Sequence, residues 1–243
     1  MITTHDLTKV FKARTAVDHV SLSIQQGTTL ALVGESGCGK STLGKLLLHL
    51  ITPSSGSVFF KGVSLDTFTP SELKRWRKKA QIIFQDPYAS LNPRMTTARI
   101  LEEPLLIHKL PRSRALLEAA LAAVNLLPTD LSKYPHEFSG GQRQRIGIAR
   151  ALMSDPEFVV CDESVASLDV STQTQILTLL KNLQKERSLT YLFISHDLST
   201  VRFMADVVAV MRHGRIIEMG PTEGIFSNPQ HPYTQELLAA TVF

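Results

Sequence analysis

Short apolar runs alternate with amphipathic stretches along most of this 243-residue chain. Apolar runs bounded by polar residues predict buried strands at residues 28–33, 81–84, 157–161 and 190–194. Apolar positions at three- and four-residue spacing predict helices at residues 43–50, 170–187 and 198–205. This alternation predicts an α/β fold, with a mainly parallel sheet and helices on both of its faces.

Shorter strands are expected near both ends of the chain, at residues 2–4, 20–24, 57–60, 207–211 and 215–218. The first three belong to an N-terminal group of antiparallel β elements, and Gly27 makes the turn that follows 20–24. The last two form a hairpin across His213 and Gly214. A terminal helix is expected at residues 233–240.

The middle of the chain, from residue 86 to residue 156, is predominantly helical. Spaced apolar residues predict helices at 98–108, 113–126 and 143–153. Prolines separate the helical pieces at Pro93, Pro104, Pro111, Pro128 and Pro135. We interpret residues 1–243 as one domain, whose α/β core comprises 1–85 and 157–243 and whose inserted helical subdomain comprises 86–156.

The densest basic run, residues 74–79, lies on a short predicted helix. The N-cap of this helix is expected at Thr69, and its first helical position at Pro70. Glu72 is expected to complete a capping box with Thr69. One interpretation is a polyanion-binding patch in which Trp76 stacks on a ligand. The other is the solvated face of an ordinary surface helix, which the capping signals favour.

Composition places the chain among soluble globular proteins, with 43% hydrophobic and 20% charged residues. No apolar run approaches the roughly 18 residues that a membrane span needs, and the N-terminus carries no export signal. The net charge of +4 is compatible with nucleic acid, anionic lipid or nucleotide. Two cysteines, Cys38 and Cys161, suggest neither a disulfide framework nor a metal cluster and fit a reducing compartment.

One segment points directly to chemistry, because it fits the pattern G-x-x-x-x-G-K-[ST] between an apolar strand and an amphipathic helix. Glycines let the backbone wrap an anion with inward N–H groups, and the following helix adds its positive dipole end. The lysine can reach the β- and γ-phosphates of a nucleotide, and the serine hydroxyl can ligate Mg²⁺. We name this segment the phosphate loop; it comprises Gly34, Glu35, Ser36, Gly37, Cys38, Gly39, Lys40, Ser41 and Thr42.

Two carboxylates follow a strongly apolar strand at Asp162 and Glu163. Ligands of open α/β sheets bind at the carboxyl ends of the strands, so Asp162 is expected beside the phosphate loop. There it would hold Mg²⁺, and Glu163 would orient or deprotonate an attacking water. A solvated strand end is the alternative, and the phosphate loop makes it less attractive.

A second helix N-terminus suited to anions follows Phe138, at Ser139, Gly140, Gly141 and Gln142. Ser139 is a good N-cap, and the glycines leave the backbone N–H groups bare. A single triphosphate needs only one of these two anion-binding sites. If the two sites lie far apart, a head-to-tail pair of such domains would sandwich two nucleotides. An ordinary capped helix remains the alternative from the residues alone.

Residues 138–142, here called the signature segment, resemble the signature motif of ATP-binding cassette (ABC) ATPases, and the other family motifs follow in order along nearly the whole chain. The resemblance implies a RecA-like phosphate-loop core and the cofactors ATP and Mg²⁺. It further implies that Phe11 stacks on adenine and that Gln85 senses Mg²⁺ and γ-phosphate. His196 would hydrogen-bond the γ-phosphate, and Asp169 would report across the dimer interface. A core phenylalanine and a structural histidine are the plainer interpretations of Phe11 and His196.

The sequence departs from the family pattern near the second carboxylate. Ser164 follows Glu163 where many relatives have proline, and Ala166 lacks the hydroxyl that the family usually has. The second departure puts one contact across the dimer in doubt, although the chemistry itself is unaffected.

Three stretches, 84–93, 138–145 and 228–234, resemble one branch of the family, the ATPase subunits of oligopeptide, dipeptide and nickel importers. The branch implies a second ATPase subunit, expected to be a different chain with a homodimer as the alternative. It also implies two transmembrane permeases and, indirectly, an extracytoplasmic solute-binding protein. The chain would be peripheral, on the cytoplasmic face of the inner membrane. No iron–sulfur cluster is expected, because the cysteine-rich extension of some relatives is missing.

We therefore expect an ATP-hydrolysing subunit that energises an importer of peptides, nickel or metal chelates. The main alternative is a non-transport ABC ATPase acting on nucleic acid or ribosomes, and nucleic acid is not expected as a partner. A phosphate-loop kinase or GTPase would leave the second anion site unexplained. A regulatory module without turnover fits poorly with the intact Asp162 and Glu163 pair.

Overall fold

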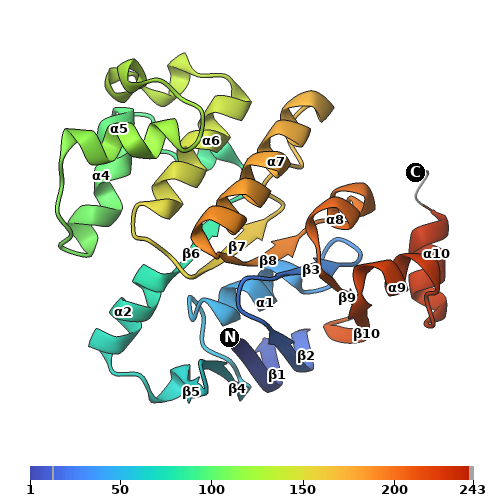
Figure 1. Cartoon of the computed structure of the whole chain (residues 1–243). Coiled ribbons are helices and arrows are strands. Elements are labelled where there is room, and N and C mark those ends of the chain that lie inside the picture. Colours follow the sequence, from blue (N-terminus) through green and yellow to red (C-terminus); the bar gives the residue numbers. More distant parts are fainter. Residues whose placement is uncertain (13, 241–243) are drawn as a thin grey trace.

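Two sheets organise the chain (Figure 1), and the computed structural model describes residues 1–12 and 14–240. The larger sheet has six strands in the order β10-β9-β3-β8-β7-β6. Its neighbouring strands run parallel except for the antiparallel pair β9 and β10. The expected α/β class with a mainly parallel sheet is therefore confirmed. The strands are β3 (Thr29–Val33), β6 (Ala80–Ile83), β7 (Phe158–Asp162), β8 (Thr190–Ile194), β9 (Val207–Arg212) and β10 (Arg215–Pro221).

Strands at the centre of this sheet are apolar along their whole length because both faces are covered. All five residues of β3 and of β8 are buried. Successive side chains point to opposite faces, so Leu192 and Ile194 join one core cluster while Tyr191 and Phe193 join the other. One face is covered by α1 (Lys40–Leu47) and the smaller sheet, and the other by α7 (Val170–Arg187) and α8 (Leu198–Met204).

The smaller sheet is antiparallel, with the order β2-β1-β4-β5. Its strands are β1 (Ile2–Phe11), β2 (Arg14–Ile24), β4 (Ser55–Phe60) and β5 (Val63–Ser64). The antiparallel group is as expected, but β1 and β2 are much longer than the predicted 2–4 and 20–24. Register shifts interrupt their pairing, and Asp6 and His19 have positive φ, so the apolar alternation is broken along the extended part.

Helices between β6 and β7 form the upper part of the molecule in Figure 1. Two predicted features differ there. Helix α5 ends at Ala122 instead of 126, and Pro104 lies inside α4 although it was expected to break the chain into pieces. Proline has a helical φ and removes only one hydrogen bond, while buried Ile100, Leu101 and Leu105 hold α4 in place. The helices are α3 (Pro87–Ser90), α4 (Thr97–Ile107), α5 (Arg114–Ala122) and α6 (Gly140–Leu152), with 3₁₀ turns at Pro128–Ser132 and Pro135–Glu137.

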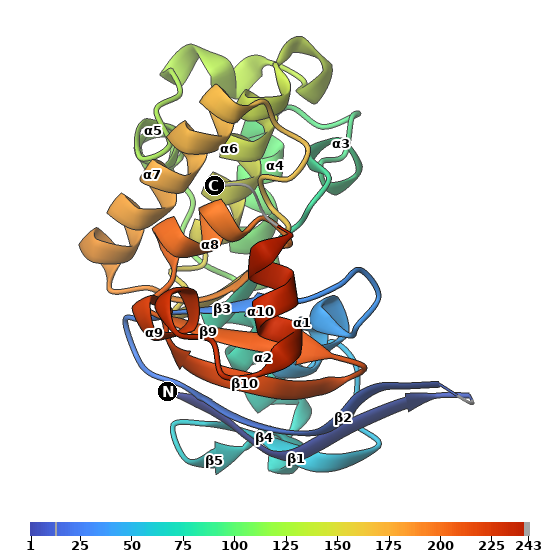
Figure 2. The ribbon, with the colours of Figure 1, turned by 90° about the vertical axis from the view of Figure 1, so that its right-hand side faces the viewer.

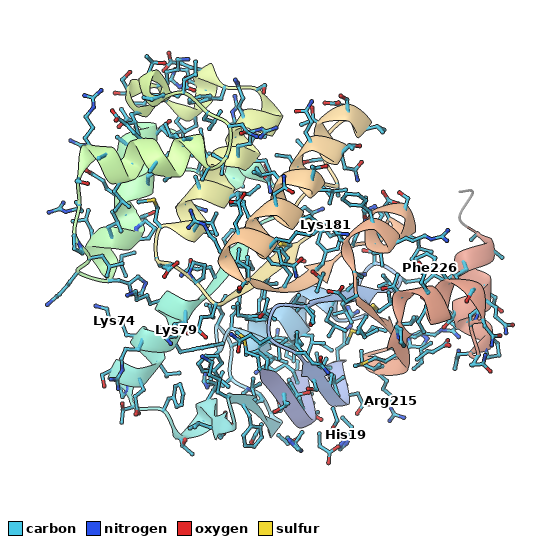
Figure 3. All side chains as sticks on the ribbon, in the orientation of Figure 1. His19, Lys74, Lys79, Lys181, Arg215 and Phe226 are labelled. Carbon is cyan, nitrogen blue, oxygen red and sulfur yellow. The ribbon has the colours of Figure 1, made fainter. Side chains whose placement is uncertain are left out.

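The basic run lies on α2 (Pro70–Lys79), which follows a 3₁₀ turn at Leu65–Thr67. The predicted capping box is present between Thr69 and Glu72. Trp76 is only 2% exposed and packs between Phe60 and Phe158, with ring centroids 4.6 and 6.4 Å away. Trp76 is therefore part of the core, which rules out its stacking on a surface ligand. Figure 3 shows Lys74 and Lys79 projecting from the same helix.

The C-terminal part packs beside the β9–β10 hairpin (Figure 2) as α9 (Thr222–Ser227) and α10 (Pro232–Ala239). The hairpin was predicted, and α10 begins one residue before the predicted helix, but α9 was not foreseen. Arg215 of β10 donates to Asp18 of β2 over 2.6 Å, which ties the hairpin to the smaller sheet near His19 (Figure 3). Among the described residues, no helix has the length and apolar content that crossing a bilayer requires.

Candidate functional site

The phosphate loop connects β3 to α1 and has a backbone shape that requires glycine. Gly34, Gly37 and Gly39 have φ values of +148°, +78° and +116°. A Cβ atom on Gly34 would lie 2.1 Å from the Met211 carbonyl oxygen. A Cβ atom on Gly39 would lie equally close, 2.1 Å, to the carbonyl oxygen of Ala16. The loop is therefore enclosed by neighbouring backbone, and side chains are excluded from both positions.

Lys40 lies within the curve of this loop. Its Nζ atom donates to the carbonyl oxygens of Gly34, over 2.7 Å, and Glu35, over 2.9 Å. The side chain is buried, and Gly39 at the N-cap offers no side-chain cap to the first turn of α1. A buried ammonium group beside bare helical N–H groups is an arrangement suited to a polyanion.

Residues of neighbouring elements donate hydrogen bonds to carbonyl groups of the phosphate loop. The N–H of Gly214 donates to the Cys38 carbonyl oxygen over 3.0 Å, and Arg14 Nη2 donates to the Gly37 carbonyl oxygen over 2.6 Å. Thr42 follows in the first turn of α1, while Ser36 is exposed at the tip. The carbonyl groups of Gly34, Glu35, Gly37 and Cys38 are thus all engaged by hydrogen bonds within the protein.

Asp162, at the carboxyl end of β7, lies against the phosphate loop as expected. Its Oδ1 atom accepts a hydrogen bond from the Ser41 hydroxyl over 2.9 Å. Burial raises the pKa of Asp162 above its ordinary value; the Ser41 hydrogen bond opposes that rise, and the nearby Glu163 carboxylate adds to it. A hydroxyl and a carboxylate oxygen at this separation fit the oxygen ligands that Mg²⁺ prefers.

Three predicted catalytic residues meet at the ends of neighbouring strands. Gln85 follows β6, Glu163 follows β7, and His196 follows β8. Gln85 Nε2 donates to Glu163 Oε2 over 2.9 Å, and His196 Nδ1 lies 3.5 Å from the same oxygen. The structure therefore brings the amide, the carboxylate and the imidazole together at one edge of the sheet.

Glu163 has an unusual backbone. Its φ is +48°, in the left-handed region that non-glycine residues seldom adopt. Its N–H donates to the Ile194 carbonyl oxygen over 3.0 Å, so β8 holds the turn.

Phe11 lies at the tip of the β1–β2 hairpin, where it pairs with Arg14, the residue that reaches the phosphate loop. The Phe11 ring is 46% exposed, and Lys9 Nζ lies 5.1 Å from its centroid. A flat, accessible ring near the loop is compatible with base stacking. The structure thus excludes the alternative of a core phenylalanine.

The signature segment is remote from the phosphate loop within one chain. Ser139 caps α6, its hydroxyl accepting the Gln142 N–H over 3.3 Å, while Gln142 Oε1 accepts the Ser139 N–H over 3.0 Å. Figures 1 and 2 both show α6 among the upper helices, well separated from α1. Gly140 begins α6, and Gly141 packs tightly on α7, since a Cβ there would lie 2.4 Å from Thr172 Cγ2.

Asp169 serves as the N-cap of α7, where its Oδ1 atom accepts the Thr172 N–H over 3.0 Å. Ser164 is buried, and Ala166 is exposed on the segment before that cap. The first turns of α6 and α7 therefore lie together, beside the two departures from the family pattern.

A groove of about 1010 Å³ lies beside Gln85 and Asp162, and it was not predicted from the sequence. It runs between α2 with β6 and the helix α4, and its lining includes exposed apolar Phe84 and Ile107. Its charged side chains are those of Lys45, Lys74, Arg77 and Arg150 together with Asp86, Glu103 and Asp162, and burial lowers the pKa of His108. The exposed apolar end of α4 was the available signal, because ordinary surface helices seldom place such residues together.

Comparisons with known proteins agree on the family. The family model described as ABC transporter matches residues 17–166. The chain is 50% identical to the oligopeptide transport ATP-binding protein OppF of Bacillus subtilis, over 93% of this chain and 75% of the relative. It is 52% identical to the dipeptide transport ATP-binding protein DppF of Escherichia coli, over 93% and 69%. It is 50% identical to the glutathione import ATP-binding protein GsiA of Escherichia coli O157:H7, over 96% and 38%.

Solved structures give the same answer for the fold. The ATP-binding cassette MJ0796, in a dimeric post-hydrolysis state with ADP and Pi, superposes with a TM-score of 0.82 at 28% identity, covering 91% of this chain and 99% of that one. The cbiO1 protein of Clostridium perfringens gives 0.84 at 28% identity, covering 93% and 90%. With these matches and the site described above, the chain belongs to the ABC transporter family and is an ATP-binding cassette ATPase.

Proposed function

We propose that this cassette binds Mg²⁺-ATP on the phosphate loop and hydrolyses it with Glu163 as the catalytic carboxylate. The observation that carries the proposal is the cluster of Ser41, Asp162, Glu163, Gln85 and His196 around that loop. Lys40 and the N-terminus of α1 would hold the β- and γ-phosphates. Phe11 would stack on the adenine.

Glu163 would accept a proton from the attacking water as the water's oxygen bonds to the γ-phosphorus and the β–γ bridge breaks. Gln85, already bonded to Glu163, would keep the carboxylate turned towards that water. His196 would donate to a γ-phosphate oxygen and so favour the charge that gathers there. The shared position of these residues at one sheet edge supports each assignment.

Ser41, Asp162 and Gln85 would hold Mg²⁺, directly or through water. The fit rests on the donor set: the serine hydroxyl and the carboxylate are already within 2.9 Å of each other, and both are oxygen donors. When bound, the ion would offset the negative charge of the β- and γ-phosphates.

The working unit would contain two cassettes that face each other. Residues Ser139, Gly140, Gly141 and Gln142 of one cassette would close over the γ-phosphate bound to the loop of its partner. Supporting this, the signature segment and the loop are widely separated in one chain, and the MJ0796 cassette was solved as a dimer. The partner would be a different ATPase chain, with a second copy of this chain as the alternative.

The groove beside Gln85 would receive a cytoplasmic helix of the permease. Its exposed apolar residues, Phe84 and Ile107, suit the apolar face of a helical segment. Two permeases and, indirectly, an extracytoplasmic solute-binding protein would complete the importer at the cytoplasmic face of the membrane. Relatives named for oligopeptides, dipeptides and glutathione favour a peptide over nickel or a metal chelate as the solute.

Two substitutions test the assignment. Glu163→Gln removes the proton acceptor but keeps the shape, so we expect hydrolysis to fall at least about 100-fold while ATP remains bound. Lys40→Ala should abolish ATP binding, because the triphosphate loses its buried cation. Lys181→Ala on α7 is a matched control that should bind ATP normally.

Near-normal turnover in Glu163→Gln would show that Glu163 is not the catalytic carboxylate. Unchanged ATP affinity in Lys40→Ala would show that the phosphate loop does not bind the triphosphate. The rival function is separated by adding DNA, RNA or ribosomes to the ATPase assay. Stimulation by any of these, in place of stimulation by reconstituted permeases, would favour the nucleic-acid alternative.

A further inference from the structure

The C-terminal helix reaches the phosphate loop through one side chain. Tyr233, in the first turn of α10, is 4% exposed. Its hydroxyl oxygen accepts a hydrogen bond from the N–H of Glu35 over 3.2 Å, although the two residues are 198 positions apart. Tyr233 belongs to the stretch 228–234, which resembles the importer branch of the family. No residue of that stretch was given a role at the nucleotide site.

The Tyr233 ring is fixed by its neighbours. The guanidinium carbon of Arg212, on β9, lies 4.4 Å from the ring centroid. His231 Nδ1 accepts the Tyr233 N–H over 3.1 Å. The Glu218 carboxylate of β10 accepts the N–H groups of Gln230 and His231 over 2.8 and 3.1 Å. These contacts fix the position of the Tyr233 hydroxyl between the β9–β10 hairpin and α10.

Tyr233 and Lys40 hold opposite ends of the same peptide group. The N–H of Glu35 and the C=O of Gly34 belong to one peptide unit; Tyr233 accepts from the former and Lys40 donates to the latter over 2.7 Å. Gly34 has a φ of +148°, and glycine presents little steric resistance to rotation of that peptide. Two hydrogen bonds at its two ends fix its orientation before any nucleotide arrives.

We propose that Tyr233 is a positioning residue for nucleotide binding, which keeps the first peptide of the phosphate loop in its binding-competent orientation. The inference rests on the proposed binding of ATP at this loop. Without the hydroxyl, the Glu35 N–H would face an apolar ring edge, and the peptide would rotate to find another acceptor. Only the fraction of molecules with the native orientation would then bind ATP, so the apparent affinity would fall by that fraction.

Tyr233→Phe removes the hydroxyl and keeps the ring on Arg212. We expect Mg²⁺-ATP to bind about three- to ten-fold more weakly, the range that the loss of one hydrogen bond gives. The KM for ATP should rise by the same factor while kcat stays within about two-fold of wild type, because the loss precedes chemistry.

Tyr191→Phe is the matched control. The Tyr191 hydroxyl is also buried and donates to a backbone carbonyl, that of Leu180, over 3.0 Å, but it lies between β8 and α7. Both variants lose one buried tyrosine hydroxyl, so a general loss of stability would affect both. A positioning role predicts weaker ATP binding in Tyr233→Phe alone.

The experiment measures binding of the non-hydrolysable analogue AMP-PNP with Mg²⁺ by calorimetry, and amide hydrogen exchange of residues 34–37, on the full chain. In wild type the Glu35 amide should be protected without nucleotide, and in Tyr233→Phe it should exchange about ten-fold faster. Unchanged affinity in Tyr233→Phe, or an equal loss in Tyr191→Phe, would overturn the proposal. Should Tyr233→Phe fail to fold, fast exchange of Glu35 in wild type would overturn the proposal and protection would support it. Failure of wild type to bind AMP-PNP would instead refute the proposed function.

Discussion

The second glycine of the signature segment supports a direct test of how α6 meets α7. A Cβ atom on Gly141 would lie 2.4 Å from Thr172 Cγ2, well inside contact distance. Thr172 is stiff about χ1 because it is β-branched, so its methyl group has little room to move away. On Gly140 a Cβ atom would lie 3.7 Å from Leu168 Cδ2, which is an ordinary contact.

These distances set the expected free energies. Overpacking typically costs about 1–3 kcal/mol, and alanine recovers up to about 1 kcal/mol through its helix propensity. Gly141→Ala should therefore lower the free energy of unfolding by about 1–2 kcal/mol. Gly140→Ala, the control, should leave it unchanged or raise it slightly.

A double-mutant cycle with Thr172→Ser isolates the contact. Serine lacks the clashing methyl group but keeps the hydroxyl on the first turn of α7. We expect Gly141→Ala to cost about 1–2 kcal/mol less in the Thr172→Ser background, measured by urea unfolding. Equal stability of Gly141→Ala and Gly140→Ala, or additive effects in the double mutant, would show that this contact does not explain the glycine.

Three further predictions concern other parts of the molecule. Burial alone would raise the pKa of Glu157, but ion pairs with Lys61 and Lys79 at 2.6 and 2.5 Å outweigh it and lower that pKa. Glu157→Gln should therefore cost about 1 kcal/mol of stability at pH 7, and urea titrations should show the difference fading as the pH falls below about 4.3. Trp76→Ala should cost about 3–5 kcal/mol in the same assay, because a large buried ring is removed, whereas a value near zero would contradict its place in the core. Arg150→Met should lower kcat with ATP affinity unchanged. Arg150 Nη1 donates to the Ser90 carbonyl oxygen over 2.6 Å and so joins α6 to the segment after Gln85. Steady-state ATPase assays would measure kcat, and an unchanged kcat would contradict this prediction.

Strong periodicity made several elements predictable. Helix α7 and strand β8 were predicted with their observed bounds, 170–187 and 190–194, because one is amphipathic over five turns and the other is apolar throughout. The predicted bounds failed where local signals were mixed. Bulges hid the length of β1 and β2, and apolar residues beyond Ala122 made the helix predicted at 113–126 longer than the observed α5.

Some contacts of the candidate site could be predicted from the sequence, and others could not. Residues that follow parallel strands gather at one edge, so the positions of Asp162 and Glu163 near the loop could be anticipated from the carboxyl end of their predicted strand. The family resemblance added His196. The contact between Tyr233 and Glu35 could not be anticipated, because the rotation of a terminal helix depends on tertiary packing. The buried position of Trp76 was missed for the same reason, since five basic neighbours dominate its local pattern.

We expect two cassettes to share each nucleotide. The structure of the assembled transporter, trapped by Glu163→Gln with Mg²⁺-ATP, would show whether they do. We expect Ser139 to Gln142 of this chain to lie within hydrogen-bonding distance of the γ-phosphate on the partner's loop. A closed, nucleotide-bound assembly in which these residues lie away from every triphosphate would contradict this expectation.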